Sequence, residues 1–365
     1  MNSTKIRDIV ERDGPFASLY IDASHNTEDA AHQHELRWRA IKEQLSTAGA
    51  DRTTVGLLED ALLATPPVPG RCGRVLIADR ETLLADEVLP EVPPRDIVRV
   101  ARLPYVLPLL EQAARQVAHV VALVDRRGSD IYAVDSSNAV VGETVQGEGH
   151  PLHKIRHGGG WSAWSIQHRV DEKIRRNIDE VAREVTRLAE QVRARVIIIG
   201  GEVTSRAALA DALPAHGAEV VQVEAGARAA GADQTEFDEQ VYAIVSEQAE
   251  QEQHSVLEKF ATESGRPEGL AVAGLAATTA ALAEANVDQL LINEAALGDR
   301  LVQTEPAPIH PVDEVQVAAG DTRAASICRA DEALPVAALN CGAAITPVDE
   351  AGAIPEGVGA LLRHR

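Results

Sequence analysis

The segment 168–201 constrains the fold more strongly than any other part of this sequence. Apolar residues recur in it at steps of four, four, three, four, three and four, at Val170, Ile174, Ile178, Val181, Val185, Leu188 and Val192. This is the 3.6-residue period of a long amphipathic helix, predicted over 168–194. The run RVIIIGG at 195–201 follows directly and is typical of a buried strand. A long helix joined to a buried strand predicts a layered α/β domain.

Strands and helices alternate along the rest of the chain. The patterns predict strands at 16–22, 218–224, 288–293 and the extreme C-terminus, a hairpin over 74–88, and a three-stranded meander over 119–147. They predict helices at 27–48, 104–117, 204–213, 234–260 and 275–286. With 365 residues, the chain has room for two or three domains. We expect a mixed α/β (α+β) protein of three domains, 1–117, 118–264 and 265–365.

Composition excludes several classes of protein. The net charge of −21 argues against a protein that coats nucleic acid through bulk charge, since neutralising phosphates requires Lys and Arg. The three cysteines, Cys72, Cys328 and Cys341, form no metal-ligand motif, so we expect no metal and no cofactor. No signal-like or membrane-spanning apolar run is found. We therefore expect a soluble cytoplasmic protein that binds neither DNA nor membranes.

One window reverses the overall charge. Residues 150–176 carry six Lys and Arg side chains against Asp171 and Glu172, a net charge of +4, and four histidines besides. Two of the three tryptophans, Trp161 and Trp164, follow a run of three glycines there. Glycine lets the backbone approach another surface closely, cations favour a polyanion, and indole rings stack on bases. The window therefore predicts an RNA-contacting loop over 150–167 mounted on the helix from 168. A Gly-rich connector whose tryptophans pack on their own domain remains the alternative.

Two weaker signals favour structural roles. Gly200-Gly201 lies between a strand and a helix, as in phosphate-binding loops, but neither GxGxxG nor GxxxxGK[ST] is present. We interpret it as a strand-to-helix turn. The acidic helix over 234–260 is most simply a solvated face.

The window and its setting resemble the middle domain of the archaeal and eukaryotic class I peptide release factors and their relative Pelota. In that family a Leu-His-Lys stretch and a basic His-Gly element precede a Gly-Gly-Gln tripeptide, Ser-Ala and a long basic helix. The matching positions here are Leu152-His153-Lys154, Arg156-His157-Gly158, Gly159-Gly160-Trp161-Ser162-Ala163 and the helix from His168. The meander at 121–137, the segment ANVDQLLINEAAL and the terminal GVGALLRHR are also similar to family segments.

Two departures from the family change the implied function. The glutamine that orients the hydrolytic water in release factors is Trp161 here, and an indole has one donor and no acceptor. The stop-codon-reading tetrad Asn-Ile-Lys-Ser is absent from residues 1–117. The pattern looks closest to the bacterial Balon-type hibernation factors, which occupy the A site of idle ribosomes with elongation factor Tu.

The resemblance implies a non-enzymatic factor that binds the A site of the 70S ribosome, its RNA and proteins, together with elongation factor Tu. The N-terminal α/β domain would reach the decoding centre, and the C-terminal domain would be an L7Ae-like α/β sandwich. A mobile Gly-rich loop of the middle domain would point at the peptidyl-transferase centre, with no catalytic residue. The loop residues are Gly158, Gly159, Gly160, Trp161, Ser162 and Trp164. The residues expected to bind ribosomal RNA are His153, Lys154, Arg156, His157, His168, Arg169, Lys173, Arg175 and Arg176.

Two alternatives remain open at the level of sequence. The first is a peptidyl-tRNA hydrolase or ribosome rescue factor of the same fold, which position 161 disfavours because it is not glutamine. The second is an adaptor that does not bind nucleic acid and docks through the acidic helix over 234–260.

Overall fold

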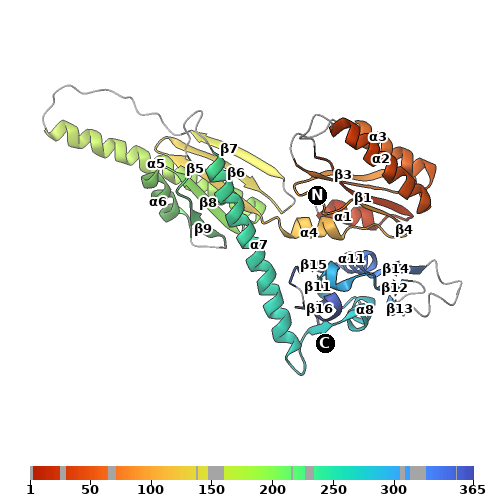
Figure 1. Cartoon of the computed structure of the whole chain (residues 1–365). Helices are drawn as coiled ribbons and strands as arrows, with labels where there is room; N and C mark the ends of the chain where they lie inside the picture. The colour runs from red at the N-terminus through yellow and green to blue at the C-terminus, as the bar shows by residue number, and fades with distance from the viewer. Residues whose placement is uncertain are drawn as a thin grey trace. The chain divides into compact units, whose positions relative to one another are not determined.

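The computed structural model describes residues 3–24, 30–64, 71–136, 139–146, 160–214, 217–226, 234–304, 309–312, 326–350 and 352–365. The chain divides into two compact units (Figure 1). The first, unit 1, combines residues 3–112 with 255–365, and the second, unit 2, holds residues 113–254.

The N-terminal part of unit 1 is an antiparallel sheet with the order β3-β2-β1-β4. Its strands are β1 (Phe16–Asp22), β2 (Gly73–Ala78), β3 (Leu83–Leu89) and β4 (Ile97–Ala101). Alternate residues of β1 serve opposite faces: Ala17, Leu19 and Ile21 pack in one apolar cluster, and Phe16 and Tyr20 in another. A strand buried on both faces needs covering layers on both sides.

Helices cover both faces of this sheet. Trp38 and Ile41 of α2 (Ala30–Thr47) and Leu58 of α3 (Arg52–Ala64) pack in the cluster of Leu19. The cluster of Tyr20 includes residues of α1 (Ser3–Val10) and α4 (Leu107–Ala114). The Tyr20 hydroxyl donates to the carbonyl of Tyr105 at 2.7 Å, which satisfies a polar group inside this core.

The C-terminal part of unit 1 has a sheet of order β10-β16-β11-β15 and a small sheet of order β13-β12-β14. The strands are β10 (Ala271–Ala273), β11 (Val287–Ile292), β12 (Leu301–Gln303), β13 (His310–Val312), β14 (Ile327–Arg329), β15 (Ala344–Pro347) and β16 (Val358–Leu362). The helical elements are α8 (Leu275–Ala283), α9 (Glu294–Leu297), α11 (Ala330–Asn340) and the short η2 (Pro355–Gly357). Strands β11 and β15 are parallel, and β16 runs antiparallel to β11.

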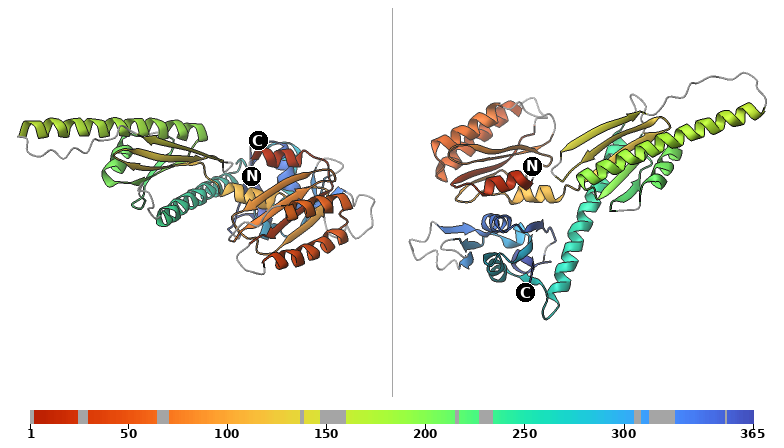
Figure 2. Two further views of the ribbon diagram at one scale, coloured as in Figure 1. Left: turned by 90° about the horizontal axis from the view of Figure 1, so that it is seen from above. Right: turned by 180° about the vertical axis from the view of Figure 1, so that it is seen from behind.

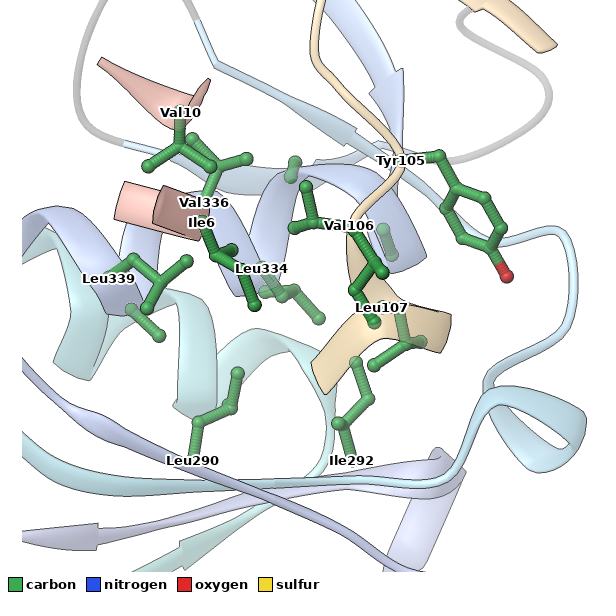
Figure 3. Packing of buried hydrophobic residues seen from close by; sticks show 14 of the residues in the cluster. Ile6, Val10, Tyr105, Val106, Leu107, Leu290, Ile292, Leu334, Val336 and Leu339 are labelled. Carbon is green, nitrogen blue, oxygen red and sulfur yellow. The ribbon is translucent and has the colours of Figure 1, made fainter. Parts of the chain in front are cut away.

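The two parts of unit 1 share one hydrophobic core. Ile6 and Val106 of the N-terminal part belong to the same buried cluster as Leu290, Ile292 and Val336 of the C-terminal part (Figure 3). Each of these five side chains is at most 6% exposed. Residues from both ends of the sequence therefore pack in the same hydrophobic core. The separation of 1–117 and 265–365 into two domains stays a prediction.

Unit 2 contains a five-stranded sheet with the order β7-β6-β5-β8-β9. The strands are β5 (His119–Asp125), β6 (Gly128–Val134), β7 (Val140–Gln146), β8 (Val196–Gly201) and β9 (Glu219–Gln222). Strands β5, β6 and β7 form an antiparallel meander, and β5, β8 and β9 are parallel. This arrangement confirms the meander and the buried strand that the sequence predicts.

Helices lie on both faces of the unit 2 sheet (Figure 2). Val120 and Ile197 share a cluster with residues of α5 (Gly160–Val192) and α6 (Val203–Ala212) on one face. Val121 and Ile198 pack with Phe237 and other residues of α7 (Thr235–Ser264) on the other. These elements confirm the mixed α/β class. Within the residues that the structure describes, no helix is both long and apolar enough to cross a membrane.

Candidate nucleic-acid interface

Helix α5 supports the candidate interface. Its 33 residues correspond to a length of about 50 Å. Ile178, Val181, Val185 and Leu188 are at most 4% exposed and pack on the sheet, as the apolar period predicts. The first turns of α5 extend past the sheet (Figures 1 and 2). One end of the helix is therefore anchored by a core, while the other lies outside it.

The prediction of a loop over 150–167 is wrong for residues 160–167, because these residues form the first turns of α5. Trp161, Ser162 and Trp164 therefore lie in a helix that begins at Gly160. The sequence WSAWSIQ contains neither glycine nor proline, and extending a formed helix costs far less than starting one. Gly158 and Gly159 lie outside the described residues.

The expected RNA-binding residues are placed unevenly. His153, Lys154, Arg156 and His157 lie outside the described residues. His168, Arg169 and Lys173 belong to α5, whose side chains are described from residue 174 onward.

The described members of that set, Arg175 and Arg176, are adjacent and exposed on α5. Neither forms a hydrogen bond or an ion pair with any residue that the structure describes. Their positive charges are therefore available to an external anion.

The structure adds a second basic element that the sequence did not assign to this site, the turn between β5 and β6. Its residues Arg126 and Arg127 are exposed. The buried side chain of Asn177, next to Arg176 in the chain, donates from Nδ2 to the Arg126 carbonyl at 3.2 Å. The turn is thereby fixed beside the basic part of α5. The sequence shows the Arg-Arg-Gly turn, but it does not show that the turn contacts Asn177, which lies 51 residues further along the chain.

Internal hydrogen bonds hold this turn in one shape. The Asp125 carboxylate accepts from the N–H groups of Arg127 at 2.7 Å and Gly128 at 3.0 Å. Asp side chains commonly stabilise turns in this way. Arg126 differs from Arg127, because its Nη2 donates to Glu202 at 3.0 Å. The Arg127 guanidinium has no partner among the described residues.

The Gly200-Gly201 segment is a strand-to-helix turn, as the sequence interpretation favoured. A carboxylate already occupies the start of the following helix: Glu202 caps α6 and accepts from the Ser205 backbone N–H at 3.2 Å and its hydroxyl at 2.6 Å. Hydrogen bonds from Ser205 lower the Glu202 pKa, and Arg126 lowers it further. A phosphate is not needed to satisfy this helix end.

An open groove of about 490 Å³ lies between α5 and the end of α6. Its lining alternates in charge, with Asp179 and Glu190 beside Arg183 and Arg187. Arg187 is paired with Glu184. A groove of balanced charge does not favour a polyanion.

Unit 2 therefore has the architecture of an αβα sandwich that carries one long helix, α5, with the exposed Arg175 and Arg176 near its middle. A family model described as bacterial archaeo-eukaryotic release factor family 2 matches residues 118–266. The chain belongs to this bacterial release-factor family.

Sequence relatives extend over the whole chain. The uncharacterized protein Rv2629 of Mycobacterium tuberculosis strain H37Rv is 36% identical over 367 residues, covering 100% of this chain and 97% of the relative. The uncharacterized protein MT2704 of strain CDC 1551 / Oshkosh gives the same values. Among solved structures, the archaeal translation termination factor aRF1 is 16% identical, with a TM-score of 0.26 over 100% of this chain and 98% of that chain. Pelota of Archaeoglobus fulgidus is 11% identical, with a TM-score of 0.36 over 100% of this chain and 92% of that chain.

Proposed function

We propose that this chain is a ribosome hibernation factor, which occupies the A site of idle 70S ribosomes in a release-factor-like manner together with elongation factor Tu. The observation that carries the proposal is the pair Arg175 and Arg176, exposed and unpartnered within the described residues on α5, in a member of a release-factor family. Ribosomal RNA is a polyanion that such cations bind.

The distribution of charge supports this proposal. The chain carries a net charge of −21, yet the window 150–176 carries +4. The acidic remainder opposes non-specific adsorption to RNA. The factor would thus touch RNA at a small number of places, with the Gly-Gly-Trp segment directed to the peptidyl-transferase centre.

We also propose that the chain blocks the ribosome without hydrolysing peptidyl-tRNA. Trp161 stands where the related release factors have glutamine, and its indole offers no acceptor to orient a water. An assay with stalled peptidyl-tRNA complexes should give no release above background. Robust release that is abolished by Gly160→Ala would instead identify a rescue hydrolase.

Cosedimentation with vacant 70S ribosomes tests the binding proposal. We expect the wild-type chain to pellet with ribosomes, and elongation factor Tu to increase the bound fraction. Reversal of both charges, Arg175→Glu with Arg176→Glu, should weaken binding and lower its dependence on salt. The matched control reverses two other exposed arginines, Arg183 of α5 and Arg193 directly after it.

Absence of wild-type binding at low salt, with and without elongation factor Tu, would overturn the proposal. Wild-type binding that is insensitive to the reversal at 175 and 176 would favour an adaptor that docks through the acidic helix α7.

A further inference from the structure

The turn between β5 and β6 is a second cationic element beside the basic part of α5. We propose that Arg127, with Arg126 beside it, contacts the phosphate backbone of RNA, and that Asn177 positions the turn for this contact. This inference rests on the proposed function, because it enlarges the RNA-binding surface of the same helix.

The backbone of the turn is held in one shape before any ligand binds. Asp125 accepts two backbone hydrogen bonds, at 2.7 and 3.0 Å, from within the turn. Asn177 is 5% exposed and uses its amide to hold the Arg126 carbonyl at 3.2 Å. A buried polar side chain that bonds a surface turn fixes where the two arginine side chains begin. Because the backbone of the turn is already fixed, only side-chain entropy is lost when these arginines bind a phosphate.

The arginines of this surface differ in whether a carboxylate is bound to them. The Arg127 guanidinium has no partner in the described part of the chain, like Arg175 and Arg176. Arg126 is paired with Glu202, and its side chain is still 61% exposed. Within the described residues, three arginines of this surface therefore have no ion-pair partner, and Arg126 has one. Glu202 lowers the positive potential of this surface, so its neutralisation should strengthen attraction to a polyanion.

The chemistry of arginine favours the phosphates of RNA as the partner of this turn. Arginine binds phosphate oxygens with paired donors, which suits the backbone of a nucleic acid. Turn and helix residues of this kind contact the backbone without reading sequence. We therefore expect the turn to add affinity and salt dependence, and no base preference.

The test measures binding of the full chain to vacant 70S ribosomes by sedimentation at several KCl concentrations. We expect Arg127→Glu to weaken binding at least about fivefold and to reduce the slope of log affinity against log salt by about 1. Arg193→Glu makes the same change of charge just past the other end of α5, and it should alter affinity less than about twofold. Equal effects of the two variants would overturn the inference.

Two further variants separate this contact from a loss of folding. Glu202→Gln keeps an oxygen acceptor for Ser205 but removes the charge beside Arg126, and it should strengthen binding about two- to fivefold at low salt. Asn177→Ala changes no charge. A lower slope of log affinity against log salt in this variant would therefore show that the turn no longer contacts phosphate. If Asn177 only stabilised the fold, the slope would stay unchanged. Unchanged affinity in Glu202→Gln together with an unchanged slope in Asn177→Ala would contradict the inference.

The outcomes also distinguish this inference from the proposed function. If the wild-type chain does not bind ribosomes, the proposed function fails. If it binds, and reversal of Arg175 and Arg176 weakens binding while Arg127→Glu does not, the inference alone is wrong.

Discussion

Arg99 of β4 donates to both carboxylate oxygens of Asp331 of α11, at 3.1 and 3.0 Å, across 232 residues of sequence. The same guanidinium lies 3.5 Å from the centre of the Tyr105 ring and donates to Glu332 at 3.2 Å. Asp331 is fully buried, and Glu332 is 3% exposed. The two parts of unit 1 therefore share a buried group of charges beside their common apolar core.

Removal of Arg99 should strongly destabilise unit 1. Arg99→Ala leaves the carboxylates of Asp331 and Glu332 buried with less compensation, and we expect the free energy of unfolding to fall by about 3–5 kcal/mol. Denaturant unfolding measures this change. Lys5→Ala is the control, because Lys5 pairs with Glu87 at the surface, and that change should cost at most about 1 kcal/mol. Similar losses in both variants would show that the Arg99 cluster does not stabilise the fold.

Glu332 should make the stability of unit 1 depend on pH. Burial raises its pKa above the ordinary glutamate value, against the opposing effect of Arg99. A raised pKa means that the folded protein binds the proton more tightly than the unfolded chain. The stabilising contribution is therefore complete below the ordinary pKa and is lost as pH rises through the raised value.

Comparison of Glu332→Gln with the wild type over a pH series tests this direction. The unfolding free energy of the variant, relative to the wild type, should rise as pH increases above the ordinary glutamate pKa. A difference that stays constant or falls over this range would contradict the direction of the shift.

Gly201 should tolerate no side chain. Its φ is +112°, and a Cβ there would lie 2.1 Å from the carbonyl oxygen of Val124. Gly217 also has a positive φ, +72°, but nothing lies within 4 Å of its Cβ position. We expect Gly201→Ala to lower the free energy of unfolding by at least about 2 kcal/mol more than Gly217→Ala. Equal thermal and denaturant unfolding of the two variants would contradict the close approach of β8 to β5.

Asp51 should stabilise the start of α3. Its carboxylate accepts from the Thr54 backbone N–H at 2.9 Å and from the Thr54 hydroxyl at 3.3 Å. We expect Asp51→Ala to cost about 1 kcal/mol in chemical denaturation, and Asp51→Asn to cost less because it keeps an acceptor.

Acidification provides a second measurement at this helix end. The hydrogen bond from the Thr54 N–H lowers the Asp51 pKa, so the advantage of Asp51 over Asn is present above the ordinary aspartate pKa and is lost as pH falls. An advantage that grows in acid would contradict this capping role.

Sequence periodicity predicted those elements whose burial follows a simple repeat. Helix α5 from Ile174 onward buries one apolar face, and strands β5 and β8 are apolar on both faces because helices cover both sides of the sheet. Helix α1 was not predicted, although Ile6 and Ile9 are buried, because eight residues contain too few turns for a clear period.

The candidate site was only partly predictable for a different reason. The basic window is a local property of the sequence, so Arg175 and Arg176 could be found by counting charges. The placement of Arg126 depends on Asn177, which is a contact between segments 51 residues apart. Such contacts leave no local pattern. The helical start at Gly160 was missed because glycine-rich flanking sequence favours a loop prediction.

The shared core of unit 1 has a consequence for the order in which the chain acquires its structure during synthesis. Unit 1 is discontinuous, and unit 2 is completed from residues 113–254 before the second half of unit 1 has emerged. Until Leu290, Ile292 and Val336 have been translated, Ile6 and Val106 lack the partners that bury them in the finished fold. Part of this shared core therefore stays exposed to water until residues 255–365 have been made, and exposed apolar surface of this kind favours aggregation of the nascent chain.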